Sequence, residues 1–124
     1  MKKIIALSIL STTLFSIPCH AFDWVLLNED KENQKAAYID AVSLNNTANS
    51  KADTQKVWGK ISDGKADMSV HSLYEVDCSQ HRVRILEIRA HNFKETQHIG
   101  TFKESYEWQA FQKNTPPALV CKQH

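Results

Sequence analysis

The sequence has few of the residues from which most enzyme sites are built. It contains three glycines and three cysteines in 124 residues, and no glycine-rich loop of the kind that cradles phosphates. Neither a Gly-x-Ser-x-Gly nor a His-Glu-x-x-His motif occurs, so the nucleophile and zinc arrangements that these motifs mark are absent. We therefore expect a protein that is not an enzyme, with no catalytic residue, no cofactor and no metal site.

Histidine is the exception, since the chain has six. Four of them, His71, His81, His91 and His98, are spaced unlike the ligand pairs of zinc sites. Because their spacing matches no ligand pair, we expect these histidines to lie on the surface. The alternative is that strand order assembles them into a small periplasmic hydrolase or redox enzyme, or into a metal- or haem-binding protein. A histidine within hydrogen-bond reach of Ser, Asp or Cys in a cleft would favour that alternative.

Long apolar runs are also missing. The longest, Ile4–Ile17, is interrupted by small polar residues and is too short to span a membrane, since a spanning helix needs roughly 18 or more apolar residues. Two lysines precede it, and a small residue, Ala21, follows at the position that a signal peptidase reads. The sequence therefore predicts a signal peptide over residues 1–21, which leaves Phe22 first in the mature chain.

Two alternatives to this cleavage remain open. A lipoprotein would begin at Cys19, but Pro18 stands before it, where lipoprotein signals have a small residue. A retained membrane anchor would need a longer apolar run. We expect an exported protein, periplasmic or secreted, with no membrane span in its mature form. Lipid anchoring through Cys19 is the weaker alternative.

The mature chain, residues 22–124, is long enough for one domain with a single core. Loss of the two N-terminal lysines from 15 basic residues, against 14 acidic ones, changes the net charge from +1 to −1. This balance gives no basic excess to attract nucleic acid. Cleavage also removes one cysteine and leaves Cys78 and Cys121, an isolated pair in an oxidising compartment.

Alternation of apolar and polar residues predicts a fold of the α+β class that is mainly β. We expect a loop at Asn45–Thr54, a hairpin turn at Asp63-Gly64, and a short C-terminal helix that starts at Pro116 with Thr115 as its N-cap. Between the last strand and that helix, Trp108 and Phe111 lie at helical spacing. The predicted strands are Phe22–Asn28, Ala36–Leu44, Gln55–Ser62, Met68–Cys78, His81–Ala90 and Ile99–Glu104.

The fourth predicted strand has the cleanest alternation. Val70, Tyr74, Val76 and Cys78 share its apolar face, so Cys78 points towards the core. Cys121 is the only other cysteine of the mature chain. We therefore predict a disulfide that pins the C-terminal segment onto this face of the sheet. The next strand is irregular, and either a bulge near Ile85-Leu86 shifts its phase or both of its faces are partly covered.

The mature chain resembles the bacterial surface-adhesin protein E-like domain family over nearly its whole length. Each shared motif is short, and it is their order and spacing that match. The residues that carry the resemblance are Trp24, Tyr38-Ile39-Asp40 with Ser43-Leu44, Val57-Trp58, Tyr74–Cys78, Arg82, Arg84, Trp108 and Cys121.

The resemblance implies a six-stranded antiparallel sheet whose C-terminal helix is tied to one face by a disulfide. It also implies a non-enzymatic binding protein of the cell envelope, whose partner would be a host extracellular-matrix protein, and which would form a homodimer. The name-giving member is an outer-membrane lipoprotein, whereas Cys19 of this chain lacks a lipobox.

The face opposite Cys78 is the expected binding surface. Apolar side chains on an uncovered sheet face often mark a ligand or self-association surface. Parity places Leu73 there, together with Trp58, and Leu86 and Ile88 join them if no bulge resets the phase. The competing interpretation is that these side chains are core, because a one-residue slip would exchange the two faces.

Overall fold

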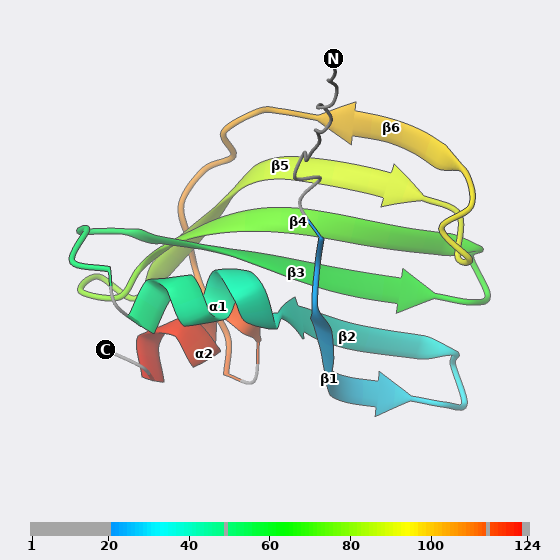
Figure 1. Cartoon of the computed structure of the whole chain (residues 1–124), viewed down its shortest axis with the longest axis horizontal. Coiled ribbons are helices and arrows are strands. Elements are labelled where there is room, and N and C mark those ends of the chain that lie inside the picture. Colours follow the sequence, from blue (N-terminus) through cyan, green and yellow to red (C-terminus); the bar gives the residue numbers. More distant parts are fainter. Residues whose placement is uncertain (1–20, 49, 114, 123–124) are drawn as a thin grey trace, which may run out of the picture.

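A computed structural model describes residues 21–48, 50–113 and 115–122. The predicted signal peptide therefore lies outside the described residues, apart from Ala21. Six antiparallel strands follow one another in chain order across a single sheet, and a short seventh strand pairs with the fifth (Figure 1). The elements are β1 (Trp24–Asp30), β2 (Lys35–Asp40), α1 (Ala41–Ala48), β3 (Gln55–Asp63), β4 (Met68–Asp77), β5 (Arg82–His91), β6 (His98–Phe102), β7 (Gln109–Ala110) and α2 (Pro116–Lys122).

The predicted fold class is confirmed, with one error in the second strand. β2 ends at Asp40, and α1 occupies residues predicted as strand and loop. The Asp40 carboxylate accepts hydrogen bonds from the backbone amides of Val42 (3.3 Å) and Ser43 (3.1 Å), which is the geometry of a helix N-cap. The Trp58 amide, which β2 no longer reaches, donates to Ser43 Oγ at 3.0 Å. Beyond the end of β2, α1 therefore lies along the edge of β3 and accepts one of its backbone hydrogen bonds.

Four hairpin turns share one backbone feature. Each has a residue other than glycine in the left-handed region, and these residues are Gln34, Asp67, His81 and Glu95, with φ between 53° and 58°. The turn predicted at Asp63-Gly64 is present, but its left-handed residue is Asp67. The sequence analysis predicted this turn from Gly64, because glycine adopts the left-handed conformation most readily.

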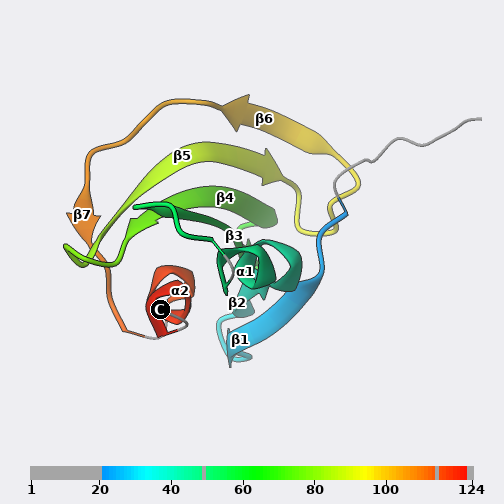
Figure 2. The same cartoon turned by 60° about the vertical axis from the view of Figure 1, so that its left-hand side comes forward.

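The inner face of the sheet, defined here as the face that α2 covers, carries the core. Ile39, Val57, Val76 and Val120 are at most 2% exposed. Figure 2 shows α2 inside the curve of the sheet. A Cβ on Gly59 would lie 3.0 Å from the ring of Pro116, so a residue without a side chain lets α2 approach the strand closely.

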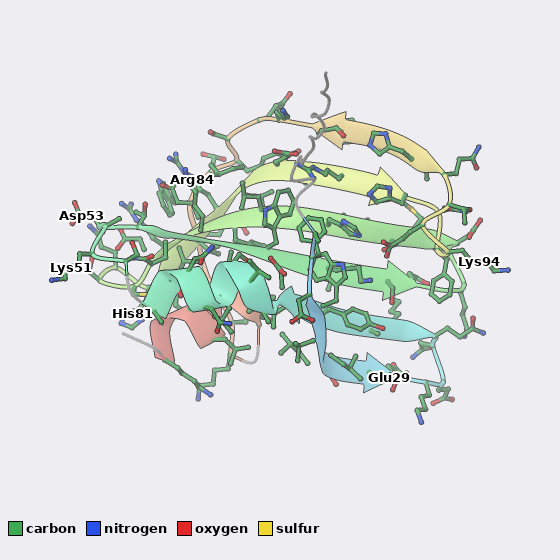
Figure 3. All side chains as sticks on the ribbon, in the orientation of Figure 1. Glu29, Lys51, Asp53, His81, Arg84 and Lys94 are labelled. Atoms are coloured by element: carbon green, nitrogen blue, oxygen red, sulfur yellow. A yellow bond between two sulfur atoms is a disulfide. The ribbon has the colours of Figure 1, made fainter. Side chains whose placement is uncertain are left out.

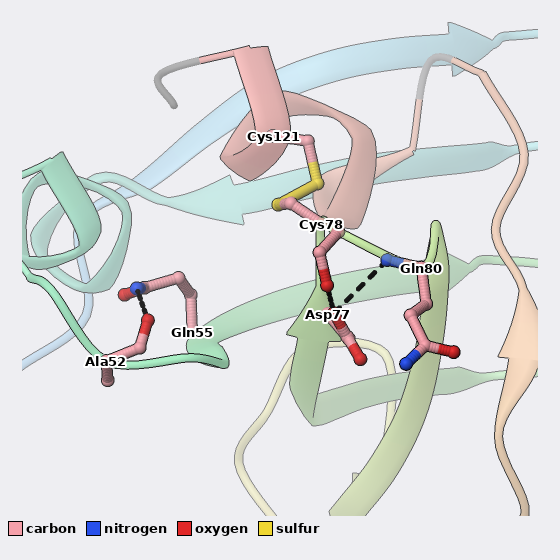
Figure 4. Close-up of a disulfide and its surroundings, with 7 residues drawn as sticks. Ala52, Gln55, Asp77, Cys78, Gln80 and Cys121 are labelled. Carbon is pink, nitrogen blue, oxygen red and sulfur yellow. Dashed lines mark hydrogen bonds between the residues drawn. A yellow bond between two sulfur atoms is a disulfide. The ribbon is translucent and has the colours of Figure 1, made fainter.

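The predicted disulfide is confirmed. Cys78 follows β4 and bonds to Cys121 of α2, with the two Cα atoms 5.4 Å apart (Figure 4). Beside it, Asp77 turns to the opposite side and accepts hydrogen bonds from Ser79 Oγ (2.8 Å) and the Gln80 amide (3.3 Å). The bond joins the C-terminal helix covalently to the end of the central hairpin.

A β-bulge explains the irregular alternation of apolar residues in β5. Leu73 pairs with Glu87 while Tyr74 pairs with Ile85, so Leu86 is the extra residue. The bulge returns Ile88 to the inner face, opposite Ser72. The predicted bulge is therefore confirmed, and both faces of β5 are also partly covered, since none of its residues is fully exposed.

The segment after β6 crosses to the inner side without forming a helix. Residues 103–108 are irregular, and β7 pairs with the start of β5. The helical spacing of Trp108 and Phe111 therefore does not indicate a helix: Phe111 packs against the core, and Trp108 lies with the arginines of β5. We call residues 103–113 the strap.

Candidate functional site

The outer face, which is the side of the sheet opposite α2, carries a layer of aromatic rings and charges. Its alternating positions on β3, β4 and β5 include Trp58, Leu73 and Glu87, which lie in register across the three strands. Trp58 and Leu73 thus lie together, as predicted. The structure separates the other two predicted binding residues from them, since Leu86 is the bulge and Ile88 faces inward.

Trp58 is not exposed as a binding residue would be. It keeps only 8% of its surface accessible, because the Phe22 ring lies 5.3 Å from it and the Arg89 guanidinium 4.6 Å from it. The outer face was expected to be uncovered, and in this respect the expectation is wrong. The first described residues of the chain cross it in front of β3 and β4 (Figure 1).

The start of β1 is held in this place by the β2–α1 junction. The Asp23 amide donates to Asp40 Oδ1 at 2.8 Å, and the Ala41 amide donates to the Asp23 carbonyl at 2.8 Å. These bonds set Phe22 against Trp24, with ring centroids 4.6 Å apart, over the centre of the sheet. The residue that caps α1 therefore also positions the rings of the outer face.

Three histidines continue this layer towards β6. His71, His91 and His98 come from β4, β5 and β6, and successive ring centroids are 4.7 Å and 5.1 Å apart. His71 also lies 5.0 Å from the Trp24 ring. The sequence analysis treated these histidines as scattered, and only the strand pairing brings them side by side.

Glu95 is the charged centre of this cluster. Its carboxylate lies 3.0 Å from Lys60 Nζ, accepts a hydrogen bond from Ser69 Oγ at 2.7 Å, and lies 3.2 Å from His71 Nε2. Burial raises the pKa of Glu95, but the bonds from Ser69 and Lys60 outweigh it, so the pKa falls below its usual value. Glu95 has φ of 58°, a costly conformation for such a side chain, and residues of this kind often cluster at functional sites.

His71 is buried beside this carboxylate. It is 5% exposed, and neither ring nitrogen makes a well-formed hydrogen bond within the described part of the chain. Burial lowers the pKa of His71, and the Glu95 carboxylate only partly opposes that effect. Burial and the charge of His98 likewise lower the pKa of His91. Neutral imidazoles are therefore favoured at neutral pH.

Arginine–carboxylate pairs complete the outer face at the β4–β5 end. Arg84 Nε lies 2.6 Å from Glu75, and Arg82 Nε lies 3.1 Å from Asp77. Both guanidiniums also lie about 4.5 Å from the Trp108 ring, at a distance typical of cation–π contacts. Figure 3 shows Arg84 at this end of the sheet and Glu29 far from it, at the β1 end.

Within the described residues, no group of His, Cys, Asp and Glu side chains is placed to hold a metal ion. His71 Nε2 lies 3.2 Å from the Glu95 carboxylate, and His98 Nε2 lies 2.9 Å from Thr101 Oγ1. No described helix is long and apolar enough to cross a membrane.

The exposed apolar part of the outer face was missed by the sequence analysis. Leu26 pairs with Tyr38 on this face and is 49% exposed. Phe93, which is 43% exposed, lines a shallow cleft together with Tyr38. The parity of β1 could have placed Leu26, but Phe93 lies in a turn, where no periodicity predicts a direction.

Comparison with known proteins gives one match. A family model described as surface-adhesin protein E matches residues 24–122, which covers β1 to α2 and includes both cysteines of the disulfide. No curated protein and no solved structure matches the chain.

Proposed function

The chain belongs to the surface-adhesin protein E family, and on that premise we propose that it is an exported, non-enzymatic binding protein of the cell envelope. Its partner would be a protein, and a host extracellular-matrix protein is the class that the family implies. The observation that carries this proposal is the outer face, where aromatic rings and arginines lie on a rigid sheet. Such side chains are enriched at protein interfaces.

The contact would centre on Leu26, Tyr38 and Phe93. Leu73 lies elsewhere on the same face, paired with Trp58. Trp58 would support this surface from below instead of meeting the partner, because it is nearly buried. Lys60 strengthens the support, since its ammonium lies 4.6 Å from the Tyr38 ring and 5.1 Å from the Trp24 ring. Rings fixed in this way lose little conformational freedom when a partner binds.

Two variants test the surface. Leu26→Ser should weaken the binding of the purified, oxidised protein to a panel of immobilised matrix proteins by about tenfold or more, the effect of about 1.4 kcal/mol. Ile61→Ser is the matched control, because Ile61 is 47% exposed but lies on the inner face. Equal loss from both variants, or from neither, would contradict the outer face as the contact.

Export requires a separate test. Mass spectrometry of protein from the cell envelope should show an N-terminus at Phe22 without an acyl group. Cell fractionation with and without inhibition of lipoprotein processing would separate a free from an anchored protein. An acylated N-terminus at Cys19 would overturn the cleavage proposal and place the protein on a membrane surface.

A further inference from the structure

The inner face has an apolar region that α2 does not fill. A cleft of about 290 Å³ lies between the sheet, the strap and the start of α2, and none of its lining side chains is charged. Ala37, Ile61 and Tyr74 form its floor, and Phe111 and Pro116 close its far end. Ile61 faces it with 47% of its surface exposed and adds a large, accessible aliphatic side chain to this apolar lining.

The cleft continues towards β1. A second cleft of about 270 Å³ shares Ala37 and Ile61 with the first, and its other lining residues include Asn28, Asp30 and Lys35. The strand pairing places Asn28 opposite Ala37 and Ile61 opposite Ala37, all on the inner face. Together the two clefts form one inner groove, defined by these residues, that runs from α2 to the β1–β2 hairpin.

The two ends of the inner groove differ in charge. The end at α2 is uncharged, while the charged residues that line the hairpin end are Glu29, Asp30 and Lys35. The Lys35 ammonium also lies 4.0 Å from the Asp63 carboxylate. Hydrogen bonds from Asn33 lower the pKa of Asp30 and keep its carboxylate ionised. The hairpin end is therefore acidic, and it complements a cation.

We propose that the inner groove binds an extended peptide segment whose apolar residues lie along the uncharged end and whose basic residue lies at the acidic end. Both clefts are open along one side, whereas a small-molecule site buries most of its ligand. An extended chain instead presents alternate side chains to a surface and needs only shallow contacts.

The apolar part of the groove is separate from the surface proposed for adhesion, because Ile61 and Leu26 are comparable in exposure but face different sides of the sheet. The hairpin end lies at the edge between the two faces, since Glu29, Asp30 and Lys35 also line the cleft of Tyr38 and Phe93. The sheet could therefore hold a peptide on its inner face while it meets another protein on its outer face. Each proposal can fail without the other.

The test uses synthetic peptides and the oxidised protein purified from the cell envelope. The first peptide alternates leucine and serine and ends in two lysines. A second peptide ends in two glutamates, and a third has serine in place of every leucine. We expect the first peptide to bind at least tenfold more tightly than either of the others, with amide NMR shift changes in β2, β3 and the strap.

Substitutions assign the site. Ile61→Asp should abolish binding of the lysine peptide, and Ile61→Thr, which suits a strand better, should weaken it severalfold if the aspartate variant does not fold. Asp30→Asn should reduce the preference for lysine over glutamate. Ile99→Asp is the matched control, because Ile99 is 60% exposed at the β6 edge, and it should leave binding unchanged.

Three outcomes would overturn the proposal outright, and a fourth would also reassign the peptide. These are unchanged binding in Ile61→Thr, shift changes confined to the outer face, and equal binding of the lysine and glutamate peptides. Loss of binding in Leu26→Ser but not in Ile61→Thr would also overturn it, and would assign the peptide to the adhesion surface.

Discussion

The two faces of the sheet are stabilised by different chemistry. On the inner face, fully buried aliphatic side chains and one disulfide fix α2. On the outer face, the main contacts are charge pairs and cation–π pairs, and the arginines in them keep 31–38% of their side-chain surface exposed. Exposed pairs contribute little stability each, so the outer face can change without loss of the fold. Such freedom suits a surface that meets a partner.

The largest expected effect is on the inner face. Cys78→Ser or Cys121→Ser should lower the free energy of unfolding by about 4 kcal/mol on the loop-entropy model, because the bond joins residues 43 positions apart. Urea unfolding would measure the loss, and limited proteolysis should release α2. The double variant is the control, and it should cost no more than either single one. Two reactive thiols in the native mature protein would contradict the assignment.

Trp58 is an exception to this difference between the two faces. It lies on the outer face but is buried like a core residue, so Trp58→Ala should cost about 3 kcal/mol or more. Leu73→Ser, at the paired position on β4, should cost clearly less, because Leu73 is only half-buried. Thermal unfolding of both variants would test this difference. Equal losses would mean that Leu73 is core as Trp58 is, and would leave it out of the surface offered to a partner.

Gly59 tests how closely the inner face is packed. A Cβ there would lie 2.9 Å from the Tyr74 ring as well as 3.0 Å from Pro116. Gly59→Ala should therefore destabilise the protein by roughly 1–3 kcal/mol through overpacking. Gly100→Ala is the matched strand control, because its nearest neighbour is the Phe102 ring at 3.4 Å, and it should change stability by less than about 0.5 kcal/mol. Comparable effects at both positions would contradict close packing of α2.

Much of this fold follows from the sequence because strand alternation and cysteine parity are local signals. They predicted the strands, the disulfide and the C-terminal helix. They also gave the bulge as one of two interpretations of the fifth strand. The error in the second strand has a physical cause. Ala41–Leu44 alternates as a strand would, but the cap that Asp40 forms and the bond from Trp58 to Ser43 favour α1 instead.

The site could be predicted only in part, because it depends on contacts between distant residues. Parity placed Trp58 and Leu73 together, but it could not show that Phe22 would cover Trp58. Nor could it show that Glu95, in a turn 24 residues after His71, would meet that histidine. The periodicity of the sequence predicts side-chain directions in strands, but it does not predict the direction of a side chain in a turn.

His71 gives the smallest expected effect, and its sign is fixed by its surroundings. The groups that face it are Glu95 from the β5–β6 turn, Lys60 from β3 and His91 from β5, with the rings of Phe22 and Trp24 above. Burial lowers its pKa in the folded state below the ordinary value of 6.5. The unfolded chain therefore binds this proton more readily than the folded protein does.

Stability should consequently fall as the pH decreases from about 7 through 6.5 towards the folded-state pKa, with a slope of at most about 1.4 kcal/mol per pH unit for one proton. The window lies above that of the carboxylates Glu75, Asp77 and Glu95, whose lowered pKa values make stability fall only in more acidic solution. His71→Gln should reduce the slope in the upper window to the part that His91 contributes, since its pKa is also lowered. His81→Asn, in an exposed turn, should leave the slope unchanged. Urea unfolding at several pH values measures both. A wild-type protein that gains stability as the pH falls from 7 to 5.5 would instead show that the Glu95 carboxylate outweighs burial at His71.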